Sequence, residues 1–204
     1  EQYQEIPSDN VPFDQAPLMK AQAITAAVIL GLTLAILRSY GRIWWCACGS
    51  WIPWSTDVNG PHNSQHFVDP YSVSHFEHGL FFFIGLWLLR DRLSLAWRLV
   101  VAMTIECGWE LLENSSFIID RYRTATISSG YVGDSILNSV SDVLFATSGF
   151  VVASLLPRTR FWAIWVAIML FCEISLILTI HDSLAINVIM LVHPIDAIRA
   201  WQAS

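Results

Sequence analysis

Charged side chains are scarce in this sequence. Asp, Glu, Lys and Arg together make up 14% of its 204 residues, whereas an average soluble domain carries about 25%. This scarcity argues against an ordinary soluble enzyme, and it excludes a disordered chain, which needs low hydrophobicity and high net charge. Basic residues are the rarer charged class, with 11 Lys and Arg against 17 Asp and Glu. The chain therefore has no basic footprint for nucleic acid, and we predict no nucleic-acid partner.

Cysteine is also scarce. The four cysteines, Cys46, Cys48, Cys107 and Cys172, show no regular spacing, which excludes a disulfide-stapled secreted mini-protein. No internal repeat of fixed period is present, nor a G-x-S-x-G nucleophile motif or a phosphate-cradling glycine loop. Several common enzyme classes are thereby disfavoured.

Apolar residues dominate instead, at 54% of the chain with 10 Trp and 11 Phe, and the mean hydropathy is +0.50. A membrane-spanning helix needs about 20 mostly apolar residues, and the sequence offers five such runs. We predict an all-α, polytopic membrane helical bundle with a C-terminal interfacial or re-entrant helix at 184–201. The five transmembrane helices are predicted at 21–38, 74–89, 93–113, 135–156 and 160–180. Residues 1–20 are predicted to form an acidic N-terminal extension and 21–204 a single transmembrane domain.

The unusual polar residues fall at four span ends that must share one membrane face, because consecutive spans cross the bilayer in opposite directions. These residues are His75 and His78, then Glu106, Glu110 and Glu113, then Asp134, Asn138 and Asp142, and finally His181 and Asp182. Within each of the first three sets the spacing is three or four residues, which places a set on one helix face. The sequence therefore predicts a His/Glu/Asp cluster at one membrane face.

Three carboxyl groups of this cluster, those of Glu106, Glu110 and Asp142, lie inside predicted spans. Each would cost roughly 2.5–3.5 kcal/mol if it faced lipid, so we expect them to face the bundle interior, paired, protonated or bound to an ion. Glu110 is expected to be the most central acid of its stripe.

The cluster could bind a divalent metal or act as a general acid and base. The catalytic candidates are Glu110, Glu113, Asp134 and Asp142. The candidate metal ligands are His75, His78 and Glu110. The candidates for substrate binding are Arg121, Arg123, Asn138 and Asp69. The structural alternative is that Glu110 and Glu113 pair with the two arginines, while Asn138 and Asp142 hold helices together.

A C-x-C motif lies in the tryptophan-rich connection 39–74. Cys46 and Cys48 could bind a soft metal with His62 or His66, form a strained disulfide, or be two buried cysteines among aromatic rings. The tryptophans suit the headgroup region, so this connection is expected to lie on the membrane surface over the polar cluster.

The two short connections are both positive, with Arg90 and Arg92 in one and Arg158 and Arg160 in the other. Positive charge in short loops marks the cytoplasmic side. We therefore expect the polar cluster on the outer side of the membrane.

Several motifs together resemble one family, an uncharacterised group of multi-pass inner-membrane proteins from alphaproteobacteria. They are CACG at 46–49, NSQH at 63–66, DPYSVSHFEHG at 69–79, WELLENS at 109–115, RYRTATIS at 121–128, YVGDSILNSVSD at 131–142 and INVIMLVHPIDAIRAWQ at 186–202. The resemblance implies a multi-pass inner-membrane location, with the polar cluster then periplasmic. The family has no assigned activity, so the resemblance does not indicate a reaction. The motif pattern is also loosely similar to that of VanZ-like membrane proteins.

The function predicted first is a membrane-embedded hydrolase or group-transfer enzyme that acts on a lipid-type substrate, with a divalent metal as the cofactor considered. The alternative is a non-catalytic accessory subunit of a larger membrane complex. Membrane lipids, and other integral membrane subunits in the alternative, are the predicted partners. Transport is less favoured because the chain has no duplicated half.

Overall fold

A computed structural model describes residues 16–126 and 128–203, and this part of the chain is helical with no β-strand. The helices are α1 (Ala16–Ser39), α2 (Ser72–Trp87), α3 (Leu95–Glu113), α4 (Ser116–Ala125), α5 (Ile136–Leu155), α6 (Phe161–Ile180), α7 (Leu184–Val192) and α8 (Asp196–Gln202). A 3₁₀ turn, Arg158–Arg160, precedes α6. The all-helical prediction is confirmed for the described residues.

Serine side chains set the start of four helices. The hydroxyls of Ser94, Ser115, Ser135 and Ser183 each accept a hydrogen bond from the backbone amide three residues on, at the starts of α3, α4, α5 and α7. Such a cap satisfies one of the amides that the first turn leaves without a partner. After Leu156 the chain reaches Pro157, and α5 does not continue because proline cannot extend a helix.

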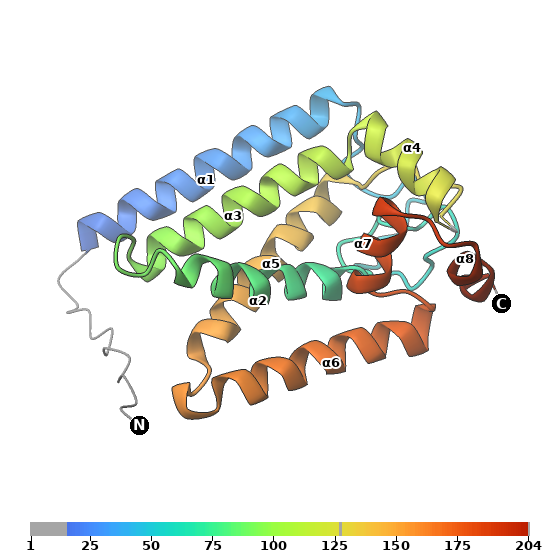
Figure 1. Cartoon of the computed structure of the whole chain (residues 1–204). Helices are drawn as coiled ribbons and strands as arrows, with labels where there is room; N and C mark the ends of the chain where they lie inside the picture. The colour runs from blue at the N-terminus through green and yellow to red at the C-terminus, as the bar shows by residue number, and fades with distance from the viewer. Residues whose placement is uncertain (1–15, 127, 204) are drawn as a thin grey trace.

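The long helices form a layered bundle, and the short elements gather at one end of it (Figure 1). Helix α1 packs along α3, α2 crosses α5 in the middle, and α6 contacts α2. Helices α4, α7 and α8 lie at the end where α2 begins and α3 ends, together with the connection between α1 and α2. This end of the molecule carries the candidate site.

Glycine permits the close crossing of α2 and α5. A side chain at Gly79 would meet the backbone of Ala146 and Phe150, and one at Gly149 would meet the backbone of Phe76. Small residues allow two helix backbones to approach in this way. The buried core beside the crossing is apolar and includes Leu80, Phe83, Leu86, Phe150 and Ala153.

Within residues 16–126 and 128–203, three helical segments are long and apolar enough to cross a membrane: Lys20–Ser39, Ile136–Leu155 and Arg158–Ile180. The first and last are each only 17% buried, whereas the second is 56% buried. The apolar surfaces of α1 and α6 are therefore turned outward, where a membrane would cover them. Helix α2 is shorter, at 16 residues, and α3 carries several ionisable residues.

The structure adds one element that the sequence did not indicate. The connection between α3 and α5 contains the helix α4. The C-terminal segment predicted at 184–201 forms two helices, α7 and α8, with the break at His193 and Pro194. The predicted extension 1–20 falls mostly outside the described residues.

Candidate metal centre and its cavity

The crossing of α2 and α5 brings His75 into a group of carboxyl side chains from two other helices. Its Nδ1 lies 2.5 Å from Oε1 of Glu106 and 3.5 Å from Oε1 of Glu110, both on α3. Its Nε2 lies 3.8 Å from Oδ2 of Asp142 on α5. Three helices thus meet at this imidazole. The sequence predicted such a meeting, because the polar ends of these helices were expected to share one membrane face.

His78 joins the same group one turn further along α2. Its Nδ1 lies 3.1 Å from one carboxylate oxygen of Glu106 and 3.2 Å from the other. The imidazoles of His75 and His78 are in edge contact, with ring centroids 5.1 Å apart. Glu106 is therefore held between two histidines in a fully buried position.

These residues form two groups that could hold a metal ion, and His75 belongs to both. The first is His75, His78 and Glu106, and the second is His75, Glu110 and Glu113. In each group the ligand atoms lie within 4.8 Å of one another. The ligand set predicted from sequence, His75, His78 and Glu110, is thus divided between the two groups, and Glu106 completes the two-histidine group.

Glu110 has the least satisfied carboxyl group of the cluster. It is fully buried, yet neither of its oxygens accepts a hydrogen bond from any described residue. A buried carboxylate without a partner costs several kcal/mol, so the group needs a proton or a nearby cation. This requirement fits a residue that exchanges a proton beside a metal.

A cavity of about 260 Å³ opens over this cluster. His75, His78, Glu113, Asp134 and Asp142 contribute polar atoms to its lining. The apolar part of the lining is Phe82, Ile105 and Trp109 from α2 and α3, and Leu184, Val188 and Leu191 from α7. Ile105 is 46% exposed and Val188 is 52% exposed, so the cavity reaches the outer surface.

Three tyrosines, Tyr71, Tyr122 and Tyr131, line the same cavity. Burial, together with neighbouring acidic groups, raises the pKa of each hydroxyl well above its ordinary value. The hydroxyls therefore stay protonated. Tyr71 donates its proton to Asp182 and Tyr131 donates its proton to Asp134, so their oxygens can accept hydrogen bonds from a bound group.

Asp134 is held in place at the rim of the cavity. Its carboxylate accepts hydrogen bonds from the side chain of Asn114 at 2.7 Å and from the hydroxyl of Tyr131 at 2.7 Å. Its backbone amide donates to the side chain of Asn114 in return. Burial raises the pKa of Asp134 above its ordinary value. The structure thus gives this candidate catalytic residue a bridging position between the ends of α3 and α5.

Asp69 and Asn138, two candidates for substrate binding, contact each other beside the cavity and not in its lining. The amide of Asn138 donates to the carbonyl of His66 at 2.9 Å and points at Asp69. Burial and the charge of Asp134 raise the pKa of Asp69 to about 6. Both residues connect the segment before α2 to the start of α5.

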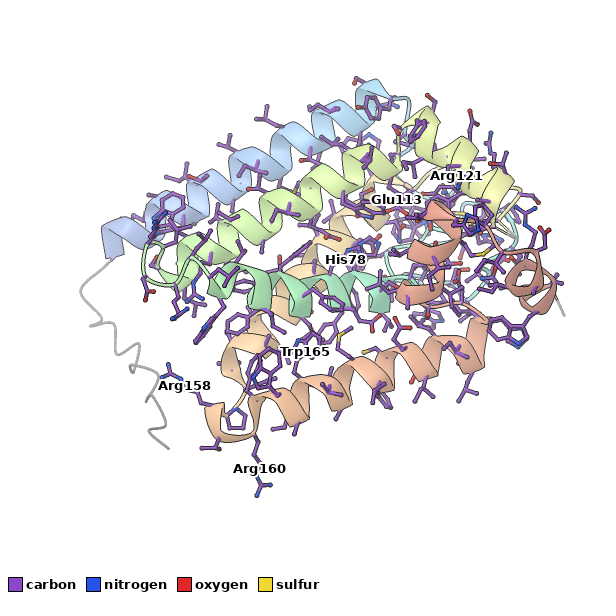
Figure 2. The ribbon with its side chains drawn as sticks, in the orientation of Figure 1. His78, Glu113, Arg121, Arg158, Arg160 and Trp165 are labelled. Atoms are coloured by element: carbon purple, nitrogen blue, oxygen red, sulfur yellow. The ribbon has the colours of Figure 1, made fainter. Side chains whose placement is uncertain are left out.

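The two arginines of α4 donate to backbone carbonyls. Arg121 donates to the carbonyls of Leu191 and Val192 at the end of α7. Arg123 donates to the carbonyl of Tyr131 and lies 3.7 Å from Asp120. Neither arginine lines the cavity, and neither forms an ion pair with Glu110 or Glu113. Figure 2 shows Arg121 and Glu113 near the same end of the molecule.

Sequence reasoning missed two features of the candidate site. Glu106 was recognised as part of the acidic stripe but not as a histidine partner, although its spacing of four residues from Glu110 placed it on the same helix face. Tyr71 was not singled out, although it lines the cavity and its hydroxyl lies 3.2 Å from Asp182, which the sequence had placed in the cluster. No local pattern marks Tyr71.

A family model described as "Protein of unknown function (DUF2585)" matches residues 37–204. The chain belongs to this family. It is 48% identical to a UPF0314 protein of Paracoccus denitrificans, over 87% of the chain and 90% of that relative. It is also 47% identical to a UPF0314 protein of Agrobacterium fabrum, over 87% of each.

These relatives confirm the resemblance to an uncharacterised alphaproteobacterial family. They do not show the looser likeness to VanZ-like proteins. No solved structure matches the chain. The chemistry of this DUF2585 protein must therefore be argued from its own residues.

Proposed function

We propose that this chain is a multi-pass membrane enzyme that uses a divalent metal ion to catalyse hydrolysis or group transfer on a lipid-type substrate. The observation that carries the proposal is the group of His75, His78 and Glu106, whose two histidines line a cavity that reaches the molecular surface. Catalytic zinc sites commonly have three protein ligands, two histidines and a glutamate among them, and leave one position open to water or substrate. Two imidazoles and one carboxylate also suit iron.

The short distance between His75 and Glu106 affects how a metal ion would bind. At 2.5 Å the two groups form a hydrogen bond, and an ion would bind in place of the proton in that bond. Metal affinity should therefore rise with pH.

The residues around the ligands provide the remaining chemistry. A bound divalent ion lowers the pKa of its water and polarises a substrate oxygen. Glu110, 3.5 Å from His75 and without a hydrogen-bond donor among the described residues, would accept a proton from an attacking water. The hydroxyl oxygens of Tyr71, Tyr122 and Tyr131, whose protons are directed at acidic side chains, are placed to accept hydrogen bonds from the donors of a polar headgroup.

The shape of the cavity favours an amphiphile as substrate. Its floor is made of histidine and carboxyl groups, and its walls are aromatic and aliphatic. Exposed apolar residues, Ile105 and Val188, lie at its outer edge. A polar headgroup would fit inside while an acyl or prenyl chain remains among the apolar residues and the surrounding lipid.

We extend the proposal to five transmembrane helices, α1, α2, α3, α5 and α6, in one domain in the inner membrane. Alternating directions then place the cavity at one face and the two arginine-rich turns at the other. Figure 2 shows Arg158 and Arg160 at the end of the molecule opposite Glu113 and Arg121. The positive-inside rule would make the cavity periplasmic.

The alternative function is an accessory subunit that acts without catalysis. A subunit of that kind would be expected to have its polar cluster closed by internal pairs. The two carboxylate oxygens of Glu110 accept no hydrogen bond from the described residues, and the cavity reaches the surface. Both observations favour an enzyme over an accessory subunit.

The proposal is tested with the full chain purified in detergent and loaded with zinc, manganese or iron. The protein is incubated with phosphatidylethanolamine, phosphatidylglycerol or a polyprenyl diphosphate, and products are identified by mass spectrometry. We expect metal-dependent cleavage or transfer on one of these probes, which His78→Ala and Glu106→Gln abolish. The control is Glu77→Gln, a buried acid on α2 that lies outside the cavity lining. Equal turnover with and without metal, or no turnover of any probe, would contradict the proposal.

A further inference from the structure

The C-x-C motif and two histidines come together in the connection between α1 and α2. Sγ of Cys46 lies 3.4 Å from Nδ1 of His62, and Sγ of Cys48 lies 3.8 Å from Nε2 of His66. The two histidine nitrogens are 3.4 Å apart. All four potential ligand atoms lie within 4.8 Å of one another, and both cysteines are free thiols.

These distances are those of a tetrahedral zinc site. Zinc–sulfur bonds of about 2.3 Å and zinc–nitrogen bonds of about 2.0–2.1 Å place a sulfur and a nitrogen ligand about 3.6 Å apart, and two nitrogens about 3.3 Å apart. The observed separations agree with these values to within a few tenths of an ångström. Two cysteines and two histidines also match a common structural zinc ligand set.

The surroundings orient the four side chains toward one point. Nδ1 of His66 lies 2.7 Å from the backbone carbonyl of Ile52, so Nδ1 carries the proton and Nε2 presents its lone pair to the cluster. Metal-bound histidines are oriented by such a bond to a carbonyl. The backbone amide of Cys48 donates to Sγ of Cys46, and that of Ser50 donates to Sγ of Cys48.

The turn that carries the two thiols requires a glycine. Gly49 has φ +74°, a left-handed conformation that glycine adopts without strain, and its amide lies 3.4 Å from the carbonyl of Cys46. The turn keeps both sulfurs on the side that faces His62 and His66.

We infer that Cys46, Cys48, His62 and His66 bind a structural zinc ion with all four positions filled by the protein. The site is separate from the His75, His78 and Glu106 group, and it stands whether or not the proposed activity is found. The protein would supply all four ligands at this site. The group of His75, His78 and Glu106 would supply only three and leave one coordination position open.

The ion would anchor the segment that borders the cavity. Between the two histidines lie Asn63 and Ser64, which line the cavity, and Gln65, whose side chain donates to the carbonyl of Gly133 at 2.7 Å. The carbonyl of Ser64 accepts from the amide of Ser135 at the start of α5. Zinc binding would therefore fix this segment against α5.

Cobalt substitution tests the inference, because thiolate ligands give a charge-transfer absorption in the near ultraviolet that histidine and carboxylate ligands do not. Metal-free full chain in detergent, kept reduced, is titrated with Co²⁺ alone. We expect the thiolate band together with the visible bands of a tetrahedral site, and displacement of both by about one equivalent of zinc. Cys46→Ser and Cys48→Ser should each weaken or remove the band, while Cys107→Ser and Cys172→Ser, in α3 and α6, should leave it unchanged.

Failure of this inference is distinguishable from failure of the proposed function. His78→Ala and Glu106→Gln should abolish turnover and leave the thiolate band intact. Cobalt binding without a thiolate band, a band that survives both Cys46→Ser and Cys48→Ser, or binding of copper(I) but not of zinc would overturn the assignment.

A second measurement uses the wild-type chain and covers the case in which the serine variants do not fold. Cys48 is exposed, whereas the other three cysteines are buried, so a thiol reagent should modify Cys48 first in metal-free protein. Zinc should slow that modification at least tenfold, as judged by peptide mass spectrometry. Equal rates with and without zinc would contradict the site.

Discussion

At the residue scale, His75 is the centre of the candidate metal site. It contacts Glu106 through Nδ1, is near Glu110 on the same side, and faces Asp142 through Nε2. A single imidazole cannot satisfy three carboxylates, and Glu110 is left without a hydrogen bond from the described residues. One residue of the cluster therefore has to be neutralised by a proton or a metal.

Replacing Glu110 separates a catalytic role from a structural one. Glu110→Gln keeps the shape of the side chain and breaks no ion pair with an arginine, so the protein should fold and retain its metal. Loss of a general base should lower turnover about 10²–10⁴-fold. Glu77→Gln is the control, since Glu77 is equally buried and neither of its carboxylate oxygens has a hydrogen-bond partner among the described residues, but it belongs to neither group of candidate metal ligands in the cluster. A drop of about 3–5 kcal/mol in stability, or unchanged turnover, would contradict the assigned role.

Asp182 should make stability depend on pH. It lies between α6 and α7, and burial raises its pKa from 3.8 to about 6. Because the folded protein keeps this proton to higher pH than the unfolded chain does, the stability that the proton contributes is full below about pH 4 and is lost as pH rises through about 6. Asp182→Asn should reduce the fall in stability between about pH 5 and about pH 7 by on the order of 1 kcal/mol.

Thermal unfolding in detergent at the two pH values measures this effect. The matched control is Asp91→Asn, because the Asp91 side chain is 80% exposed and its removal should leave the wild-type slope. Identical slopes for wild type and Asp182→Asn would show that Asp182 does not titrate as the structure requires.

The residues of the cluster were largely predictable, and their pairing was not. Helical spacing and alternating span directions are enough to place His75, His78 and the acids at one end. Which acid contacts which histidine depends on how α2 is rotated against α3 and α5, and the sequence does not specify this rotation. Glu106 was therefore left out of the predicted ligands, and Arg121 was assigned to substrate although it donates to carbonyls of α7.

At the element scale, the crossing of α2 and α5 positions the whole site. Gly79→Ala would place a methyl group against the backbone of Ala146 and Phe150, which cannot move as a side chain can. Forced overpacking of this kind costs about 1–3 kcal/mol, and we expect a lower midpoint of thermal unfolding and weaker metal binding.

Gly85 on the same helix provides the control. A methyl group there meets no atom within 4 Å, so Gly85→Ala should be neutral or stabilising because alanine favours helix over glycine by up to about 1 kcal/mol. Equal unfolding temperatures for the two variants would contradict the close crossing.

The long helices were easier to predict than the short ones. Runs of about 20 apolar residues mark α1, α5 and α6 directly, and the predicted ends agree with the observed ends to within a residue or two at Ile136 and Ile180. Helix α4 is polar and ten residues long, so it gives no hydropathy signal. It is stabilised by the Ser115 cap and by the contact of Arg121 with α7, and such contacts exist only in the folded chain.

At the scale of the whole molecule, the arginine-rich turn before α6 and the candidate metal site lie at opposite ends. Arg158 and Arg160, in the turn before α6, lie at one end, and Glu113, which lines the cavity, lies at the other (Figure 2). This polarity predicts the orientation in the membrane. The connection between α1 and α2 should be accessible from outside the cell, and the turn at Arg160 should be accessible only from inside.

Single cysteines test the orientation. Trp51, which is 90% exposed, and Arg160, which is also exposed, are each replaced by Cys in a chain that carries Cys48→Ser. A membrane-impermeant thiol reagent should label Trp51→Cys in intact cells and Arg160→Cys only after the membrane is opened. The reverse pattern would place the cavity in the cytoplasm.

The central claim is that His75, His78 and Glu106 bind a divalent metal ion, and metal content tests it most directly. Full chain purified in detergent is compared with the double variant His78→Ala, Glu106→Gln by mass-spectrometric metal analysis, with Glu77→Gln as the matched control. The account predicts that the double variant loses about one equivalent of metal relative to wild type and that the control loses none. Equal metal content in wild type and the double variant would contradict it.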